Sequence, residues 1–486
     1  MPTDPTTRSQ VEAYRFMLRR MESALVRKDP VMQHEPMRNH LTATMVGVVA
    51  AVLGLAAFFV VGMFSPTTQV RPGDILVVKS SGAVFVVQDD RQLVPVLNVT
   101  SARLLVAALN HSSSGPPDTK NVDESALAGF SRKRTTGLIG APTLPSPENL
   151  VSGAWSVCET AGSDGDPAGP APASTTVLIG GGQTGRSLGQ DEALLVRAPG
   201  DATTYLVHDG HRSAIEPSGG VASAYNLGGA VPRQIGFGLL NAIPATRPLT
   251  PPDPPDVGLP TPFPQLTGVQ VGNVVRVEVS DEQFFLLLKD GKQQVPQAVA
   301  NVIRYQRGKA KFDTVAPQDI AAVPDAPQSS RLDFGDFPAT VPRLLPDSEA
   351  RNACLFWPGP GQEPVVSTSA DPQLPLGQTS SAVDVPGGGN GQVADRVALP
   401  PGKGALVRSV VPGQDPDKGP IWLVSEQGLR YRVPSVDVAR ALGLGDRTSP
   451  APQTILGLLP IGPELDPRRA LELFDPALAR QQQGEH

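Results

Sequence analysis

The sequence has little cysteine, few aromatic residues and no basic run, and each shortage argues against a class of protein. Its 2 cysteines and 6 histidines show none of the spacings typical of Cys/His metal sites. A net charge of −6 without a basic cluster gives nucleic-acid binding little support. Aromatic residues make up only 5%, whereas there are 52 prolines and 49 glycines. This composition favours short strands, turns and linkers, and 486 residues suffice for two or more domains.

One long stretch lacks charge altogether, and it predicts a transmembrane helix. Residues 41–64 contain no charged side chain, and roughly 20 apolar residues are enough to cross a bilayer core. A cleaved signal peptide is one alternative, but about 40 residues precede the stretch and no small-residue cleavage site follows it. A buried core helix is the other alternative.

Positive charge lies mainly before this stretch, which predicts the orientation of the chain. Between residues 65 and 89 the only cations are Arg71 and Lys79. Those before the stretch include Arg15, Arg19, Arg20, Arg27, Lys28 and Arg38. The positive-inside rule therefore places residues 1–40 in the cytoplasm and residues 65–486 outside it.

The segment before the apolar stretch predicts an amphipathic helix. Ser9 and Glu12 have the spacing of a capping box at a helix start. One apolar stripe follows at spacings of three and four residues, flanked by Arg15, Arg19 and Arg20: Val11, Tyr14, Leu18, Met21 and Leu25. Such a helix docks on a partner, lies on an anionic leaflet or is simply solvated. We expect docking on a partner, through the stripe together with Arg19 and Arg20.

The remaining chain contains one pattern twice. "VRPGDILVVKSSGAVFVVQDDRQLVPV" (70–96) aligns with residues 269–297, and residues 193–217 align with residues 405–435. Because later matches keep the same order, residues 65–245 and 265–465 are predicted to be two copies of one unit. A Pro-rich spacer, expected to be extended and stiff, joins them at 246–264, and a tail follows at 466–486.

Each copy contains two apolar hairpins with tight polar turns, each followed by a helical stretch. The predicted fold is therefore α+β and rich in strands. A single transmembrane helix precedes an elongated, duplicated extracytoplasmic body, in which four hairpin-plus-helix modules surround a central β domain.

The stretch "TTVLIGGGQTGRS" (175–187) has the appearance of a phosphate-binding loop, through Gly180, Gly185, Arg186 and Ser187. However, Arg186 stands where such a loop needs lysine. The second copy reads "VPGGGNGQVADR" at the equivalent place, which repeats the glycines but not the Gly-Lys-Ser/Thr spacing. We therefore interpret the glycines as a structural bend, and predict no cofactor, no metal and no ATP site.

The two cysteines occupy equivalent places in the two copies. Cys158 lies 85 residues after Gly73, and Cys354 lies 82 residues after Gly272. Equivalent positions meet most simply across a pseudo-two-fold axis, and disulfides persist outside the cytoplasm. We therefore predict a disulfide that clamps the two copies, with Trp155 and Trp357 packed over it.

Several motifs in order resemble the EccB family of type VII (ESX) secretion systems over nearly the whole chain: "RSQVEAYRFMLRRMESALVRKD" (8–29), "LVPVLNVTSARL" (93–104), "LIGAP" (138–142), "AWSVCETAG" (154–162) and "GLLPIGPEL" (457–465). The resemblance implies one span, four repeat modules around a central domain, one disulfide, and an inner-membrane position with the C-terminal body in the periplasm. It also implies assembly with EccC (an FtsK-like motor), EccD and EccE, and contact with the protease MycP.

The resemblance predicts a structural scaffold subunit that supports protein export. Two alternatives stay open. Family members are described as ATPases, an activity for which this chain lacks the expected loop lysine, and the repeated hairpins could instead form a cell-wall-binding module.

The predicted orientation can be tested with reporters fused after His486. A phosphatase that is active only outside the cytoplasm should be active there, because residues 65–486 are expected to be exported. Activity of a reporter that works only in the cytoplasm would overturn the orientation.

Overall fold

The computed structural model comprises two compact units, Met1–Gln69 and Val70–His486, which we describe separately. The described residues are 7–28, 36–63, 70–89, 91–110, 115–162, 173–182, 184–278, 281–371, 373–374, 376, 381–389 and 391–474.

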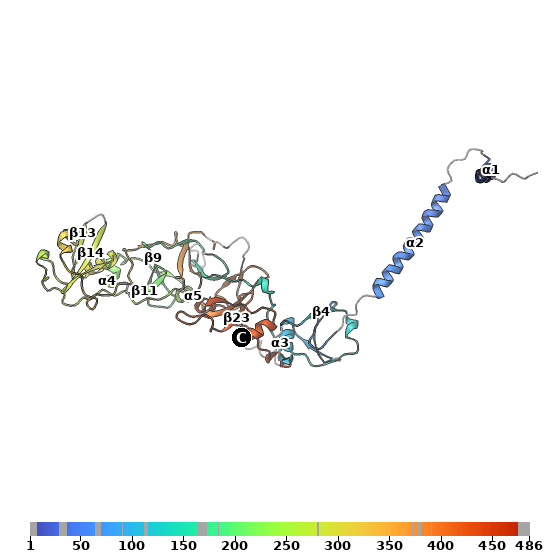
Figure 1. The fold of residues 1–486 in the computed structure, drawn as a ribbon. Coiled ribbons are helices and arrows are strands. Elements are labelled where there is room, and N and C mark those ends of the chain that lie inside the picture. Colours follow the sequence, from blue (N-terminus) through green and yellow to red (C-terminus); the bar gives the residue numbers. More distant parts are fainter. Residues whose placement is uncertain are drawn as a thin grey trace, which may run out of the picture. The chain divides into compact units, whose positions relative to one another are not determined.

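The first unit contains two helices, α1 (Arg8–Arg27) and α2 (Pro36–Met63). Helix α1 begins earlier than the predicted Ser9–Glu12 box, because the cap is Thr7, whose N–H donates to Gln10 Oε1 at 2.9 Å. Figure 1 shows α2 as one continuous helix. Within the described residues it is the one helix long and apolar enough to cross a membrane, over His40–Val60.

Four of the five sheets described in the second unit share one strand order. Each has three consecutive antiparallel strands, a helix after the third, and a later strand that lies parallel to the first. The first comprises β1 (Ile75–Val78), β2 (Val84–Asp89), β3 (Gln92–Val96), α3 (Val99–Asn110), β4 (Thr119–Val122) and an edge strand β5 (Ser131–Arg132). The second comprises β9 (Glu192–Arg197), β10 (Thr204–His208), β11 (His211–Ile215), α4 (Gly220–Ala224) and β12 (Arg233–Gln234), and β17 (Arg343–Leu344) also pairs with β9.

The other two sheets of this kind come from the second half of the chain. The third comprises β13 (Val274–Glu278), β14 (Glu282–Leu288), β15 (Gly291–Val295), α6 (Gln297–Gln306) and β16 (Asp313–Val315). The fourth comprises β22 (Ala405–Val410), β23 (Ile421–Val424), β24 (Arg430–Val433), α8 (Val436–Ala441) and β25 (Ser449–Pro452). Shorter helices lie outside these sheets: α5 (Phe237–Ala242), α7 (Pro317–Ala321), α9 (Gln453–Leu456), and the 3-10 turns η1 (Glu124–Leu127), η2 (Pro147–Asn149), η3 (Pro264–Leu266) and η4 (Arg469–Leu471).

The turn between β10 and β11 shows why these hairpins form where they do. Asp209 and Gly210 both have positive φ, 45° and 75°, as a tight two-residue turn requires. A Cβ on Gly210 would lie 2.6 Å from the carbonyl oxygen of Pro364. Only glycine therefore satisfies both the turn and the packing of this hairpin against the second half of the chain.

The fifth sheet contains seven strands and combines both halves of the chain. Its order is β20-β21-β7-β6-β18-β19-β8. The first half contributes β6 (Trp155–Thr160), β7 (Ser174–Ile179) and β8 (Arg186–Ser187). The second half contributes β18 (Asn352–Trp357), β19 (Val365–Ser369), β20 (Ala382–Asp384) and β21 (Arg396–Ala398).

At the centre of this sheet, β6 and β18 run antiparallel with Cys158 opposite Cys354. The two sulfurs are bonded and the Cα atoms lie 4.0 Å apart, so the disulfide predicted between the halves is present in the structure. Both cysteines are buried beside Leu178 and Ala398 on one face of the sheet.

The tryptophans do not cover this bond, so that prediction was wrong. Trp155 and Trp357 pair opposite each other three positions from the cysteines. Side chains alternate between the two faces of a strand, so an offset of three places the tryptophans on the opposite face. There Trp155 is fully buried in the main apolar core, and Trp357 packs against that core.

The main apolar core is formed by residues from both halves of the chain. The main cluster includes Ile235 and Leu239 from the first half and Val407 and Leu459 from the second. Three pairs of helices also join the halves: α3 with α8, α4 with α6, and α5 with α9. Burial of these shared surfaces therefore stabilises both halves together.

The first part of the Pro-rich segment at 246–264 is packed. Thr246 and Leu249 donate backbone N–H bonds to Arg212 and Ala214, so the segment runs along β11. Leu249 is buried in the core of the second sheet. Leu249 therefore anchors this part of the segment to the second sheet.

Candidate functional site

In the glycine loop at 180–187, the backbone of Gly185 passes close to β19 at the edge of the seven-stranded sheet. Gly180 and Gly185 have φ of 74° and 78°. A Cβ on Gly185 would lie 2.4 Å from the carbonyl oxygen of Thr368 in β19. The next two residues, Arg186 and Ser187, form β8 and pair with β19. This close approach to a neighbouring strand accounts for Gly185 without any ligand.

The Arg186 side chain is bound within the protein. Its guanidinium donates two hydrogen bonds to the Glu192 carboxylate, at 2.6 and 3.1 Å, and Arg343 donates a third at 2.8 Å. These donors, Arg186 foremost, lower the pKa of Glu192 to about 2. In this arrangement Arg186 neutralises a carboxylate of its own chain rather than facing an open loop.

The two histidines of the β10–β11 turn bond locally. Nδ1 of His208 lies 3.2 Å from the Asp209 carboxylate, and Nδ1 of His211 lies 2.8 Å from the Asp209 carbonyl oxygen. Among the described residues, no group of three or more His, Cys, Asp or Glu side chains could hold a metal ion.

Helix α1 presents the predicted stripe to its surroundings. Its five apolar side chains are all exposed, from 39% for Val11 to 80% for Leu25. Met17 is also exposed, and it lies three residues after Tyr14 and four before Met21. Met17 therefore widens the stripe, although the stripe predicted from Val11 at spacings of three and four residues did not include it. Exposed apolar faces of this length are typical of surfaces that bind a partner protein or a membrane.

Two buried charged residues of the first half, Glu159 and Arg233, lie against the backbone of the second half. Glu159, next to Cys158, is fully buried, and one of its carboxylate oxygens accepts the N–H of Gly236. Arg233 donates to the carbonyl oxygens of Ala350 and Arg351, the latter at 2.9 Å. Burial raises the pKa of the Glu159 carboxyl to about 7, despite the Gly236 hydrogen bond and the charge of Arg233. The sequence contains no signal for this pair, because its members come from distant strands.

Known proteins resemble this chain over nearly its whole length. The family model described as type VII secretion system ESX-1, transport TM domain B, matches residues 3–477. The ESX-3 secretion system ATPase EccB3 of Mycolicibacterium smegmatis is 33% identical, covering 96% of this chain and 91% of that protein. The ESX-5 secretion system ATPase EccB5 of Mycobacterium marinum is 30% identical, covering 97% and 94%.

Solved structures of ESX complexes also contain chains that resemble this one over most of its length. A chain of an intact ESX-5 inner membrane complex has 28% sequence identity and a TM-score of 0.68, covering 98% of this chain and 97% of that chain. A structure of an EccB3 dimer from the ESX-3 core complex has 31% identity and a TM-score of 0.69, covering 82% and 99%.

The Glu159 carboxyl should make stability depend on pH. Its pKa is about 7 in the folded protein against an ordinary value of 4.5, so the folded state retains a proton that the unfolded state loses. Its contribution to the free energy of unfolding should therefore fall by about 3 kcal/mol as pH rises from 4.5 to 7. Denaturant unfolding of the detergent-purified protein, followed by tryptophan fluorescence at several pH values, measures this.

Glu159→Gln should remove this contribution to the pH dependence of the free energy of unfolding, because the amide does not titrate. Glu363→Gln is the matched control, since Glu363 is exposed, and it should leave the pH dependence of the free energy of unfolding unchanged. An identical pH profile for Glu159→Gln and the unmodified protein would contradict this assignment.

Proposed function

Since the chain belongs to the EccB family of type VII secretion systems, we propose that it is a structural subunit of an ESX-type inner-membrane complex that supports protein export. One observation carries this proposal. The chain matches a chain of an intact ESX-5 inner membrane complex over 98% of its length, including the N-terminal helices.

We further propose that the four similar sheets are repeats of one module around the central sheet. Modules 1 and 2 lie in residues 65–245, and modules 3 and 4 lie in residues 265–465. The shared strand order supports the repeat. The helix pairs support a pseudo-two-fold axis through the disulfide, because such an axis relates α3–α8 to α6–α4. In each module a later segment also lies parallel to the third strand.

The proposed topology has residues 1–40 in the cytoplasm, the apolar segment at 41–64 in the membrane and the body on the periplasmic side. The exposed apolar length of α2 and the cations of α1 support it. A related structure is a periplasmic assembly from the ESX-5 inner membrane complex, at 28% identity over 85% of this chain.

The proposed partners follow from this topology. Only residues before α2 can reach cytoplasmic parts of an EccC-type motor, EccD or EccE. The body is free to contact MycP and further copies of the chain, and the EccB3 dimer of the ESX-3 core complex is a precedent for self-association. We therefore assign docking on the cytoplasmic side to the stripe of α1, with Arg19 and Arg20 beside it.

ATP hydrolysis is not part of the proposal, although the relatives named above carry the word ATPase in their names. The one loop of this chain that resembles a nucleotide site contains Gly180, Gly185, Arg186 and Ser187. Its cation is already paired with Glu192, and Gly185 is explained by its approach to Thr368. The proposal therefore assigns this loop a structural role.

Leu18→Glu tests the docking role of α1. Each apolar side chain of the stripe that a partner buries contributes about 1.5–3 kcal/mol, so a charge at its centre should reduce assembled complex about tenfold or more. Complex yield is measured on blue-native gels of membrane extracts. Membrane insertion and the protease resistance of the body should stay unchanged, because neither depends on α1.

Ser23→Glu is the matched control. It adds the same charge to the same helix about 140° around from Leu18, and should leave assembly intact. Arg19→Ala and Arg20→Ala should weaken assembly less than Leu18→Glu if apolar packing dominates. Normal complex yield and normal secretion with Leu18→Glu would show that α1 is not the docking element.

A further inference from the structure

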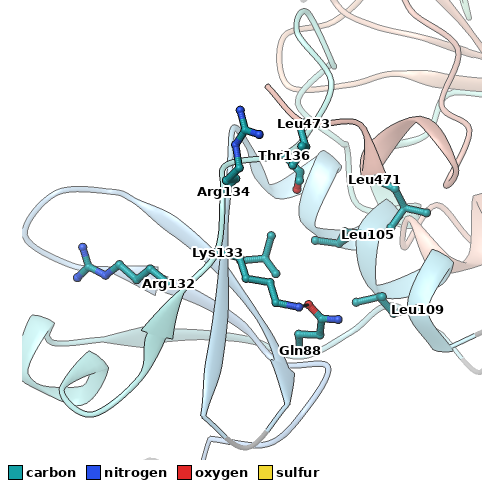
Figure 2. Close-up of a pocket in the computed structure, with 10 residues that line it drawn as sticks. Gln88, Leu105, Leu109, Arg132, Lys133, Arg134, Thr136, Leu471 and Leu473 are labelled. Atoms are coloured by element: carbon teal, nitrogen blue, oxygen red, sulfur yellow. Dashed lines mark hydrogen bonds between the residues drawn. The ribbon is translucent and has the colours of Figure 1, made fainter. Parts of the chain in front are cut away.

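A cavity of about 480 Å³ lies where the end of the described chain meets the first sheet. Its apolar lining comes from three elements: Val94 on β3, Leu105 and Leu109 on α3, and Leu471 and Leu473 near the end of the described chain (Figure 2). The volume lies within the range of small-molecule sites, roughly 300–1,000 Å³.

The wall formed by the end of the described chain is fixed in place. Leu473 forms an isolated antiparallel bridge with Thr136, and the N–H of Phe474 donates to the carbonyl oxygen of Thr135. Helix α3 contacts η4, which ends at Leu471. Even so, Leu471 and Leu473 remain 47% and 53% exposed. The structure thus holds two leucines open toward a cavity instead of burying them.

The polar lining of this cavity is cationic. Arg132, Lys133 and Arg134 all contribute to it, and no acidic side chain is among the described residues that line it. None of the three forms an ion pair within the described part of the chain. Arg132 instead stacks over Phe85, with 5.5 Å to the ring centroid.

Lys133 is the cation that faces the apolar lining. Figure 2 shows its side chain reaching toward Gln88, whose amide oxygen accepts a hydrogen bond from Nζ at 2.7 Å. Gln88 is neutral and Lys133 is exposed, so the ammonium group is open to an anionic ligand. Figure 2 shows Arg134 near Thr136, with its guanidinium pointing away from Lys133.

We propose that this cavity binds an anionic phospholipid, with an acyl chain against the leucines and the headgroup phosphate paired with Lys133. A soluble anion would make no use of the leucines, and a purely apolar ligand would make no use of Lys133. In the sequence only eleven residues separate α2 from β1, the first strand of this sheet. The choice of a lipid rests on the proposed topology, in which this sheet follows the transmembrane helix directly.

Photo-labelling of the full chain in a neutral maltoside detergent tests the proposal. The probe is phosphatidylglycerol with a diazirine on one acyl chain, and labelled peptides are located by mass spectrometry. Label should concentrate on the peptides that contain Leu105, Leu109, Leu471 and Leu473. Phosphatidylcholine with the same diazirine should label them severalfold less, because its phosphate is neutralised by choline.

Two variants, each with a matched control, identify the binding groups. Lys133→Met should reduce phosphatidylglycerol labelling about tenfold, as expected for loss of a charge-assisted bond. Lys311→Met, at an exposed lysine elsewhere, should not. Leu473→Asp should abolish labelling by both lipids, whereas Leu259→Asp, at a leucine of similar exposure, should have no effect.

Four outcomes would overturn the proposal. Equal labelling by both lipids would remove the role of the cations, and full competition by inorganic phosphate alone would indicate a simple anion site. Labelling that appears only after deletion of residues 475–486, or only on dilution to single chains, would mean that the tail or a second copy is the occupant. Because labelling uses the purified chain, its failure is distinguishable from a failure of complex assembly, which Leu18→Glu measures in cells.

Discussion

The structure of the body depends on one pair of strands. β6 and β18 come from different halves of the chain, yet they lie side by side in the middle of the seven-stranded sheet, to which the first half contributes three strands and the second half four. The Cys158–Cys354 bond joins them across a sequence separation of 196 residues. In the chain-entropy model, closing a loop of that length stabilises the folded state by up to about 5 kcal/mol. Because a slip of one residue would exchange the faces of either strand, the bond also fixes which side chains enter the main core.

Other contacts between the halves follow from this pairing. Once β6 and β18 are in register, the helices of the outer sheets meet in pairs, α3 with α8 and α4 with α6. Buried Arg233 adds polar links between the same halves through its bonds to the carbonyl oxygens of Ala350 and Arg351. A body organised in this way suits the proposed role, since a subunit that holds other subunits in place must keep its own parts in a constant arrangement. The proposed binding surfaces lie in exposed features of the chain: the stripe of α1, and the cavity beside Leu473 in the body.

Much of this organisation could be predicted from the sequence, because it depends on local pattern. Turns such as Asp209–Gly210 mark hairpins directly, and the equivalent positions of Cys158 and Cys354 are sufficient to predict their pairing. Features that depend on distant contacts could not. The parallel strands β5 and β12 are two residues long and polar, so no periodicity marks them. The cavity exists only because the end of the described chain returns to Thr136. The position of the tryptophans was predictable in principle, since an offset of three reverses the face, but proximity in sequence was mistaken for proximity in space.

Amide hydrogen exchange on the purified full chain tests most directly whether one strand pair holds both halves together. The amides of β6 and β18 should be among the slowest to exchange, at rates that match each other and global unfolding. The cores of the first and fourth sheets should lose protection together, as should those of the second and third, because each pair shares a helix contact. The account would be contradicted if the sheets of one half lost protection as a unit while β6, β18 and the sheets of the other half stayed protected.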